Sequence, residues 1–549
     1  MYLNQKLYVA HSSNGPIYLT GNMCNRHGLI AGATGTGKTV SLQVLAETFS
    51  QAGVPCFMAD MKGDLSGISQ VGKMTIFIEK RCQEFGIENP DFQPCPVRFY
   101  DVYGEQGFPM RTTISAMGPQ LLARLMDLNE TQAGVLNIVF KIADDKELLL
   151  IDLKDLRLML DFVAKNASLF TTTYGNVSAA SVGAIQRAIL AIESEGGDKF
   201  FGEPAFDVND LLDVENGKGV MSVLAADKLM LNPKLYSTYL LWLMTELYAT
   251  LPEVGDLDLP KLIFFFDEAH MLFDGTSKAL VDKLEQVIRL IRSKGVGIYF
   301  ITQSPTDIPD NILAQLSNRV QHALRAFTPK EQKDVRAAAE TFRANPEFKT
   351  DEAIMSLETG EALVSFLDEK GAPAIVERAR ILFPLSQIGA ITEGQRMDIK
   401  NAAPARIKGY EQFFDRESAY ETLTAANQEA EAIKIREQEA KEAEKAEKLA
   451  QKEAEKLQKA AEKEAAKAEK EAEKNSSKWK RTIFGTMIGA AISSVARSIG
   501  TKVGKAVTGS VSKGSKKSTG GDILGKAAKS ATTTATRKIT EEMLKSIFK

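Results

Sequence analysis

The fold of this 549-residue chain is decided by the stretch Gly32-Ala33-Thr34-Gly35-Thr36-Gly37-Lys38-Thr39, which matches the pattern G-x-x-x-x-G-K-[ST]. Its glycines let the backbone curl with the N–H groups pointing inward, and the positive end of the following helix faces the same space. In this pattern the lysine reaches the β- and γ-phosphates of a nucleotide, and the threonine hydroxyl binds Mg²⁺. We therefore predict a nucleotide-binding loop made by Gly32, Ala33, Thr34, Gly35, Thr36, Gly37, Lys38 and Thr39, with Thr39 also a metal ligand.

The sequence around this loop fits the order strand, loop, helix, strand. Residues 28–31 are a short apolar run, residues 40–49 have the spacing of an amphipathic helix, and residues 54–59 are a second apolar run. Such a βαβ unit favours an α/β fold in which helices cover both faces of a parallel sheet. The polar residues 60–64 follow the second strand, at the carboxyl edge where ligands bind in open α/β folds.

A second motif supplies a pair of carboxylates. Residues 262–266 are continuously apolar, as in a strand buried on both faces, and Asp267 and Glu268 follow directly. In phosphoryl-transfer sites such a strand brings an Asp to Mg²⁺, and an adjacent Glu can orient and deprotonate the attacking water. We assign Asp267 to the metal and Glu268 to the catalytic base. The alternative is that the two carboxylates only cap the next helix.

Two more polar residues follow these strands. His270 completes an Asp-Glu-Ala-His string that invites comparison with DEAH-box helicases, but the sequence shows no second ATPase lobe with their arginine-rich motif. We expect His270 to be a packed residue at the start of a helix. Gln303 ends the strand predicted at 296–301, beside the Asp-Glu strand, and is a candidate sensor of the γ-phosphate. The alternative for Gln303 is an amide that caps the strand.

In many ring ATPases an arginine of one subunit completes the active site of its neighbour. It reaches the neighbour's nucleotide and stabilises charge in the transition state. Three arginines near the predicted strands are candidates for this role. The sequence does not choose among them, and each could instead form an ordinary surface ion pair. The candidates are Arg292, Arg319 and Arg325.

Taken together, these motifs resemble those of the HerA/FtsK superfamily of hexameric DNA-translocating ATPases, in particular its bacterial HerA-like branch. The resemblance covers roughly residues 5–425. It is carried by the glycine loop and by the strings NRHGLIA (25–31), DMKGDL (60–65), FDEAH (266–270), ITQSP (301–305) and DRESAYE (415–421).

The resemblance implies a RecA-like core, ATP and Mg²⁺ as cofactors, a homohexameric ring, and movement of double-stranded DNA through its centre. It implies that Lys38 and Thr39 bind nucleotide and Mg²⁺, that Asp267 and Glu268 serve the metal and the water, and that Gln303 senses the γ-phosphate. One feature departs from the family, because HerA proteins place a β-barrel domain before the glycine loop and only 31 residues precede it here. A nuclease or other protein partner is therefore left open.

The resulting prediction is an α/β fold: a RecA-like P-loop NTPase core with a mainly parallel sheet, an inserted helical subdomain, a long charged C-terminal helix and a basic tail. The helical subdomain is predicted because apolar residues recur at helical spacing where strand patterns stop. The predicted parts are an N-terminal β-hairpin (1–27), the first part of the core (28–110), the helical insertion (111–219), the second part of the core (220–385), a C-terminal extension (386–428), a single helix (429–474) and the tail (475–549).

Composition limits the cellular setting. The four cysteines lack C-x-x-C spacing and the four histidines do not pair with them, so we expect neither a disulfide framework nor a zinc site. The first residues lack the pattern of a signal peptide, and no run reaches the roughly 18 apolar residues of a membrane span. We expect a reducing, cytoplasmic location, with peripheral contact to a membrane left open.

Charge is segregated toward the C-terminal end. Residues 429–474 contain thirteen Ala, fourteen Glu and eleven Lys, which favours a single solvated helix over a coiled coil. At 1.5 Å per residue that helix would be about 70 Å long. Residues 475–549 hold fifteen Lys or Arg and three Asp or Glu, although the whole chain has a net charge of −3. This tail has three interpretations: DNA binding without sequence preference, contact with an anionic membrane, or packing between subunits.

The function predicted from the sequence is an ATP-hydrolysing ring motor that acts on DNA as a helicase or translocase. Two other classes stay open: a nucleotide-gated scaffold that recruits partners through the long helix, and a membrane-associated coupling ATPase. An ATPase rate that does not respond to duplex DNA would favour the scaffold. Flotation with anionic liposomes would favour the coupling ATPase.

Overall fold

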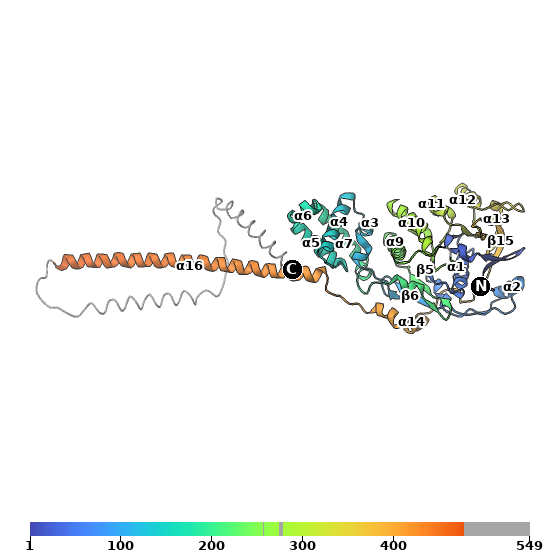
Figure 1. The fold of residues 1–549 in the computed structure, drawn as a ribbon, viewed down its shortest axis with the longest axis horizontal. Coiled ribbons are helices and arrows are strands. Elements are labelled where there is room, and N and C mark those ends of the chain that lie inside the picture. Colours follow the sequence, from blue (N-terminus) through green and yellow to red (C-terminus); the bar gives the residue numbers. More distant parts are fainter. Residues whose placement is uncertain (256, 274–277, 477–549) are drawn as a thin grey trace. The chain divides into compact units, whose positions relative to one another are not determined.

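The computed structural model describes residues 1–255, 257–273 and 278–476 (Figure 1). The chain forms two units, residues 1–423 and residues 424–549. The basic tail predicted at 475–549 therefore lies outside the described residues, apart from its first two positions.

The first unit is built on one mixed sheet, which has 13 strands within the described residues. Its central strands run parallel in the order β13-β4-β12-β11-β5-β10-β6, and β14, β15, β2 and β1 continue antiparallel beyond β13. The predicted α/β class with a mainly parallel sheet is confirmed. The strands are β1 (Tyr2–Leu3), β2 (Lys6–Ser12), β3 (Gly15–Leu19), β4 (Gly28–Ala31), β5 (Cys56–Asp60), β6 (Val97–Asp101), β7 (Phe108–Pro109), β10 (Met221–Ala225), β11 (Leu262–Phe266), β12 (Val296–Thr302), β13 (Asn318–Gln321), β14 (Glu361–Ser365) and β15 (Glu377–Ile381).

The central strands are apolar on both faces because each face has its own core. In β11, Phe264 and Phe266 point into one core and Ile263 and Phe265 into the other, since successive side chains of a strand alternate. The first core is covered by α9 (Pro233–Thr250) and α10 (Lys278–Ile291). The second is covered by α1 (Lys38–Gln51), whose Phe49 ring lies 6.3 Å from that of Phe265. Because β11 is buried on both faces, its sequence is continuously apolar, and this run allowed the strand to be predicted.

A block of helices occupies the chain between β7 and β10. Its longer helices begin with side-chain caps, for example the capping boxes of Asn129 before α4 and Asp152 before α5, and their apolar faces join the first core. A short antiparallel hairpin with two residues in each strand, β8 (Val214–Glu215) and β9 (Lys218–Gly219), ends the block. The helices are α3 (Ile114–Leu125), α4 (Glu130–Asp145), α5 (Leu153–Lys165), α6 (Ala167–Tyr174), α7 (Ala179–Ser194) and α8 (Gly197–Phe200).

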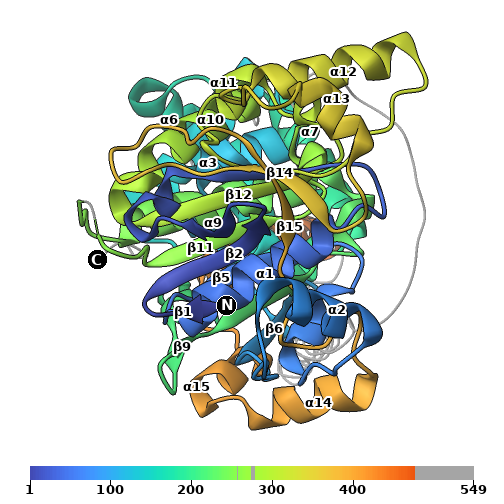
Figure 2. The ribbon, with the colours of Figure 1, turned by 90° about the vertical axis from the view of Figure 1, so that its right-hand side faces the viewer.

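The N-terminal strands are more than the isolated hairpin that the local pattern suggested. Strands β2 and β3 pair antiparallel as expected, but β2 also pairs with β15 and so extends the main sheet. The pairing joins segments more than 360 residues apart, which no local pattern could reveal. Figure 2 shows β2 and β15 among the strands of this edge, with α2 (Ile76–Phe85) beside β15.

The C-terminal segments of the first unit connect to the helical block. After α14 (Glu393–Ala402) and α15 (Ala405–Lys408), the string DRESAYE leads into α16 (Ala419–Ser476). The Ser418 hydroxyl lies 2.5 Å from Oδ1 of the fully buried Asp155 of α5, and the Tyr420 N–H donates to the same oxygen at 2.8 Å. The long helix therefore begins at residue 419, ten residues before the charged run that predicted it.

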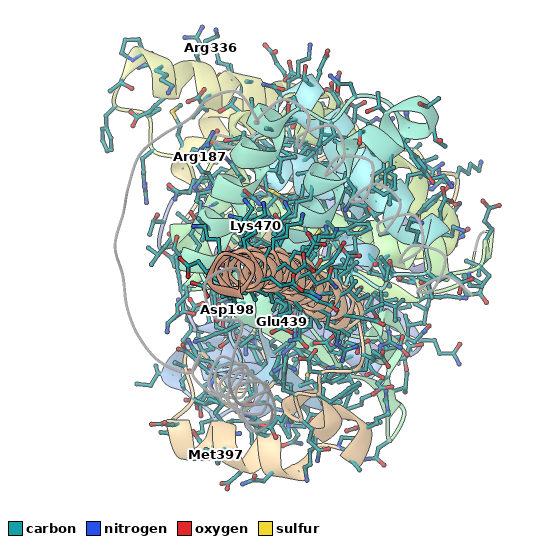
Figure 3. All side chains as sticks on the ribbon, turned by 90° about the vertical axis from the view of Figure 1, so that its left-hand side faces the viewer. Arg187, Asp198, Arg336, Met397, Glu439 and Lys470 are labelled. Atoms are coloured by element: carbon teal, nitrogen blue, oxygen red, sulfur yellow. The ribbon has the colours of Figure 1, made fainter. Side chains whose placement is uncertain are left out.

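Beyond residue 423, α16 is a polar helix. Its side chains from 439 to 471 are exposed in the single chain, and Glu439 and Lys470 project from it (Figure 3). Lys448 and Glu444 form an ion pair one turn apart, as expected for a solvated helix. No helix in the described part of the chain has both the length and the apolar stretch that crossing a bilayer requires.

Candidate functional site

The glycine loop has the backbone conformation that its sequence predicts. Gly32, Gly35 and Gly37 have φ angles of 154°, 77° and 114°, in the region that side chains disfavour. Gly37 precedes α1 and brings no capping side chain, so the N–H groups of the first helical turn remain available to an anion. Within this turn Lys38 and Thr39 are half-buried.

The loop rests on a fully buried histidine. A Cβ added to Gly32 would lie only 2.5 Å from the Cβ of His322, so the close approach requires glycine. One ring nitrogen of His322 lies 2.7 Å from the Ser41 hydroxyl and the other 2.9 Å from the carbonyl of Glu361. Burial lowers the pKa of His322 to about 4, which keeps the ring neutral at physiological pH. Sequence reasoning missed this residue, since only the fold brings β13 beneath the loop.

Backbone hydrogen bonds hold the loop at two further points. The Ala33 N–H donates to the carbonyl of Ala323 at 2.8 Å, and the Gly360 N–H donates to the carbonyl of Thr36 at 3.0 Å. The loop is therefore fixed to the segments that follow β13 and precede β14. A loop held in this way is positioned before a ligand binds.

The structure brings Lys38 and the two carboxylates to the same edge of the sheet. Strand β12 separates β4 from β11, so the two motif strands lie about 10 Å apart. The Lys38 ammonium donates to the carbonyls of Gly32 at 2.7 Å and Ala33 at 3.2 Å. Burial lowers the pKa of Lys38, and the nearby charges of Glu268 and Asp267 oppose this shift. The charges of the two motifs therefore act on one another across the sheet edge.

Glu268 is held from both neighbouring strands. Its Oε1 accepts from the Lys62 ammonium at 2.6 Å, and its Oε2 accepts from the Gln303 amide at 3.4 Å. His270 contributes a third contact, with Nδ1 at 3.5 Å from Oε2. Although burial acts to raise the pKa of Glu268, the bonds from Lys62 and Gln303 lower it below its ordinary value. The carboxylate is therefore ionised at neutral pH, as a base requires.

The backbone of Glu268 is itself unusual. Its φ and ψ are 47° and 48°, a left-handed conformation that glutamate seldom adopts. Such backbone strain persists when the surrounding structure determines it, and it is concentrated at functional sites.

Asp267 is buried at the end of β11. Burial raises its pKa to about 6, the adjacent Glu268 adds to this shift, and Lys62 opposes it. Asp267 forms no ion pair with any of the described residues, and a buried carboxylate of this kind fits a metal ligand. Mg²⁺ commonly takes one or two protein oxygens and completes its shell with water and phosphate. Thr39 and Asp267 suit that donor set, whereas no group of three or more His, Cys, Asp or Glu converges anywhere in the described residues.

The string that follows β5 has two roles that the sequence left unassigned. Asp60 accepts from the N–H groups of Lys62, Gly63 and Leu65 at 3.3, 2.8 and 3.2 Å, so its carboxylate shapes the turn. This turn brings the Lys62 ammonium within hydrogen-bonding distance of Glu268. The position of these residues after the neighbouring strand was the only indication of this in the sequence.

Two of the candidate arginines lie near β13. The Arg319 guanidinium donates to the backbone carbonyls of Leu316 at 2.8 Å, Thr341 at 2.8 Å and Leu313 at 3.1 Å. A role toward a neighbouring subunit would require Arg319 to exchange these bonds for a phosphate. Arg325 follows β13 and is exposed.

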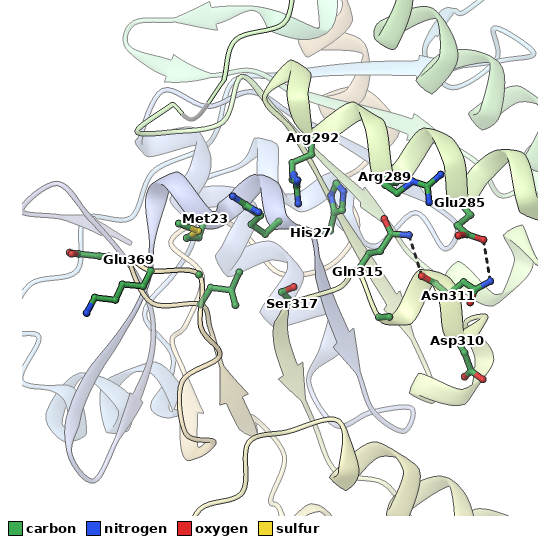
Figure 4. Close-up of a pocket in the computed structure, with 15 residues that line it drawn as sticks. Met23, His27, Glu285, Arg289, Arg292, Asp310, Asn311, Gln315, Ser317 and Glu369 are labelled. Atoms are coloured by element: carbon green, nitrogen blue, oxygen red, sulfur yellow. Dashed lines mark hydrogen bonds between the residues drawn. The ribbon is translucent and has the colours of Figure 1, made fainter.

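Arg292 lines a pocket of about 790 Å³ at the other edge of the sheet (Figure 4). Arg26, Arg289 and the acidic Glu285 line the same pocket, and Glu285 and Arg289 are one turn apart on α10. Arg26 precedes β4, so the pocket lies at the amino ends of the strands whereas the glycine loop follows their carboxyl ends. Arg292 is therefore placed away from the nucleotide loop of its own chain.

Comparison with known proteins identifies the family. The family model described as "Helicase HerA-like C-terminal" matches residues 5–518. No curated protein matches the chain.

Among solved structures, the chain is similar to the bacterial conjugative coupling protein TrwBdeltaN70 in its unbound monoclinic form, with 15% identity over 71% of this chain and 92% of that chain and a TM-score of 0.47. It is also similar to TrwB in complex with ADP and Mg²⁺, with 17% identity, 72% and 88% coverage and a TM-score of 0.42. VirB4 of Thermoanaerobacter pseudethanolicus gives 14% identity, 71% and 97% coverage and a TM-score of 0.42. From the family match over nearly its whole length, the chain belongs to the family Helicase HerA-like C-terminal.

Proposed function

We propose that this protein is an ATP-hydrolysing motor whose reaction takes place between the glycine loop and the carboxyl end of β11. The observation that carries the proposal is the placement of Lys38 and Thr39 at the same sheet edge as Asp267 and Glu268, close enough for the carboxylates to act on the pKa of Lys38. ATP and Mg²⁺ are the proposed cofactors, in keeping with the pattern of the loop.

Each side chain has a defined task in this reaction. The loop N–H groups bind the phosphates, and Lys38 exchanges its carbonyl partners for phosphate oxygens. The ionised Glu268 accepts a proton from the attacking water. Gln303, which directly follows β12 and donates to Glu268, senses the γ-phosphate. Thr39 and Asp267 would hold Mg²⁺, which would supply positive charge to neutralise the phosphates.

The proposal extends to a homohexameric ring that moves double-stranded DNA. Its support is the family, whose description names a helicase, and the basic sequence of residues 475–549. In such a ring one of Arg292, Arg319 and Arg325 would act on the nucleotide of the next subunit. Two of the three lie on faces that a neighbour can reach: Arg292 in the pocket of Figure 4 and Arg325 on the loop after β13.

The test is ATP hydrolysis by the full chain with and without Mg²⁺ and linear duplex DNA, beside a Lys38→Ala variant. We expect Mg²⁺-dependent hydrolysis that duplex DNA stimulates and that Lys38→Ala abolishes. Hydrolysis that survives Lys38→Ala would contradict the site. A rate that DNA leaves unchanged would contradict the motor on DNA and favour the scaffold.

A further inference from the structure

A cluster of exposed apolar side chains stands at the start of α2. Met74, Ile76 and Phe77 have exposed fractions of 50%, 88% and 48%. Thr75 between them caps the helix by accepting from the Ile78 N–H at 3.2 Å. Three neighbouring large apolar residues exposed to solvent indicate a surface that binds a ligand or another protein.

This cluster adjoins the glycine loop. The Gly360 N–H donates to Thr36 of the loop at 3.0 Å, and a Cβ on Gly37 would lie 3.4 Å from the Cα of Gly360. A Cβ on Gly360 would lie 3.2 Å from Nη2 of Arg81 and 3.9 Å from Cζ of Phe77. Gly360 therefore contacts the phosphate-binding loop and lies beside both the Phe77 ring and the guanidinium of Arg81.

The ring of Phe77 is supported from beneath by a network of charges. The Arg81 guanidinium lies 5.1 Å from the ring centroid, and Arg81 is itself buried. Its Nη1 lies 3.3 Å from Glu84, which also accepts from Arg380 of β15 at 2.9 Å. One face of the ring thus packs over a fixed guanidinium, while about half of the residue remains open to solvent.

We propose that Phe77 is the platform on which the base of the bound nucleotide stacks. The inference rests on the proposed function, because it places the phosphates of that nucleotide in the glycine loop. From there the ribose and base extend beyond the loop, and Phe77 is an aromatic surface one residue away. Aromatic and apolar groups beside a few polar anchors are the usual lining of such a site. Stacking of a base on an aromatic ring strengthens binding by roughly 5- to 150-fold, and a purine, with its larger π surface, gains more than a pyrimidine.

The test compares ligands that share phosphates but differ in the base. The dissociation constants of ADP, CDP and pyrophosphate are measured by calorimetry for the full chain, Phe77→Ala, Phe77→Trp and Lys38→Ala. Phe414→Ala is the matched control, because Phe414 is a similarly exposed phenylalanine of the C-terminal extension. We expect Phe77→Ala to weaken ADP roughly 10-fold, to weaken CDP less, and to leave pyrophosphate unchanged. Phe77→Trp and Phe414→Ala should bind ADP as the parent protein does.

Two results would overturn the platform: Phe77→Ala weakening ADP and pyrophosphate equally, or weakening neither. An unchanged ADP affinity with an altered sedimentation coefficient would assign the cluster to contact with a second copy of the chain. Lys38→Ala separates this failure from failure of the site itself. If Lys38→Ala binds ADP and pyrophosphate as tightly as the parent protein, the glycine loop is not the phosphate site and the proposed function falls with it.

Discussion

The Lys62 ammonium lies 2.6 Å from Oε1 of Glu268, and this ion pair links the turn after β5 to the segment after β11. On the other side, Gln303 at the end of β12 reaches the second carboxylate oxygen at 3.4 Å. The base is therefore fixed by both strands that flank its own. These contacts to both carboxylate oxygens hold the Glu268 side chain in one orientation, although the backbone of this residue is in the left-handed region.

Replacing Lys62 by methionine should change the pH dependence of hydrolysis. The bond from Lys62 lowers the pKa of Glu268 while burial acts to raise it, so without Lys62 the pKa rises. The base would then be protonated at a higher pH, and the acid limb of the pH–rate profile should move upward. Lys62→Arg keeps the charge and should keep the profile. A Lys62→Met profile that coincides with that of the parent protein would show that the pair does not act on the base.

Asp267→Asn should stabilise the folded protein while it removes activity. Because the folded pKa of about 6 exceeds the 3.8 of an unperturbed aspartate, the ionised carboxylate destabilises the fold above pH 6, and this penalty disappears as the pH falls below 4. The shift corresponds to at most about 3 kcal/mol of unfolding free energy at pH 8, and to about half of that at pH 5. Urea denaturation at the two pH values measures the difference. Asp258→Asn, at an exposed aspartate, is the control. If both variants changed the unfolding free energy equally, the raised pKa of Asp267 would be refuted.

Gly32→Ala should damage the nucleotide loop without unfolding the chain. The new methyl group would meet the Cβ of His322 at 2.5 Å, and alanine disfavours a φ of 154°. Strain of this kind should weaken ATP binding by roughly 10-fold or more. Gly134→Ala is the matched control, since a Cβ there meets nothing within 4 Å. Equal ATP affinity in the two variants would argue against a close contact between Gly32 and His322 that requires glycine.

The sequence predicted the features of this site that are local in the chain. Residues 262–266 form β11 with the predicted bounds, because five consecutive apolar residues are typical of a strand between two cores. The sequence could not predict that His322 lies beneath the loop or that Lys62 pairs with Glu268. Both contacts join residues more than 200 positions apart and depend on the strand order. The pairing of β2 with β15 was missed for the same reason.

Subunit mixing should identify the arginine that acts between subunits. The three candidates are replaced by alanine one at a time, and each variant is mixed with Lys38→Ala. An arginine that acts in trans should cost roughly 10³-fold or more in rate when replaced. Activity should return in the mixture, because the Lys38→Ala subunit supplies the missing arginine to an intact loop. Arg336→Ala, an exposed arginine of α12 (Pro329–Glu340), is the control. If no mixture regains activity, none of Arg292, Arg319 and Arg325 acts in this way.

The role of Glu268 in activating the water that attacks ATP is tested by the steady-state rate of hydrolysis of the full chain and of Glu268→Gln, each with saturating Mg²⁺ and linear duplex DNA. Removing a general base should lower the rate by roughly 10²- to 10⁴-fold, while ATP binding persists because Lys38 and the loop are intact. Glu352→Gln, at an exposed glutamate, should leave the rate unchanged. Equal rates for the parent protein and Glu268→Gln would contradict the role of Glu268 as the catalytic base.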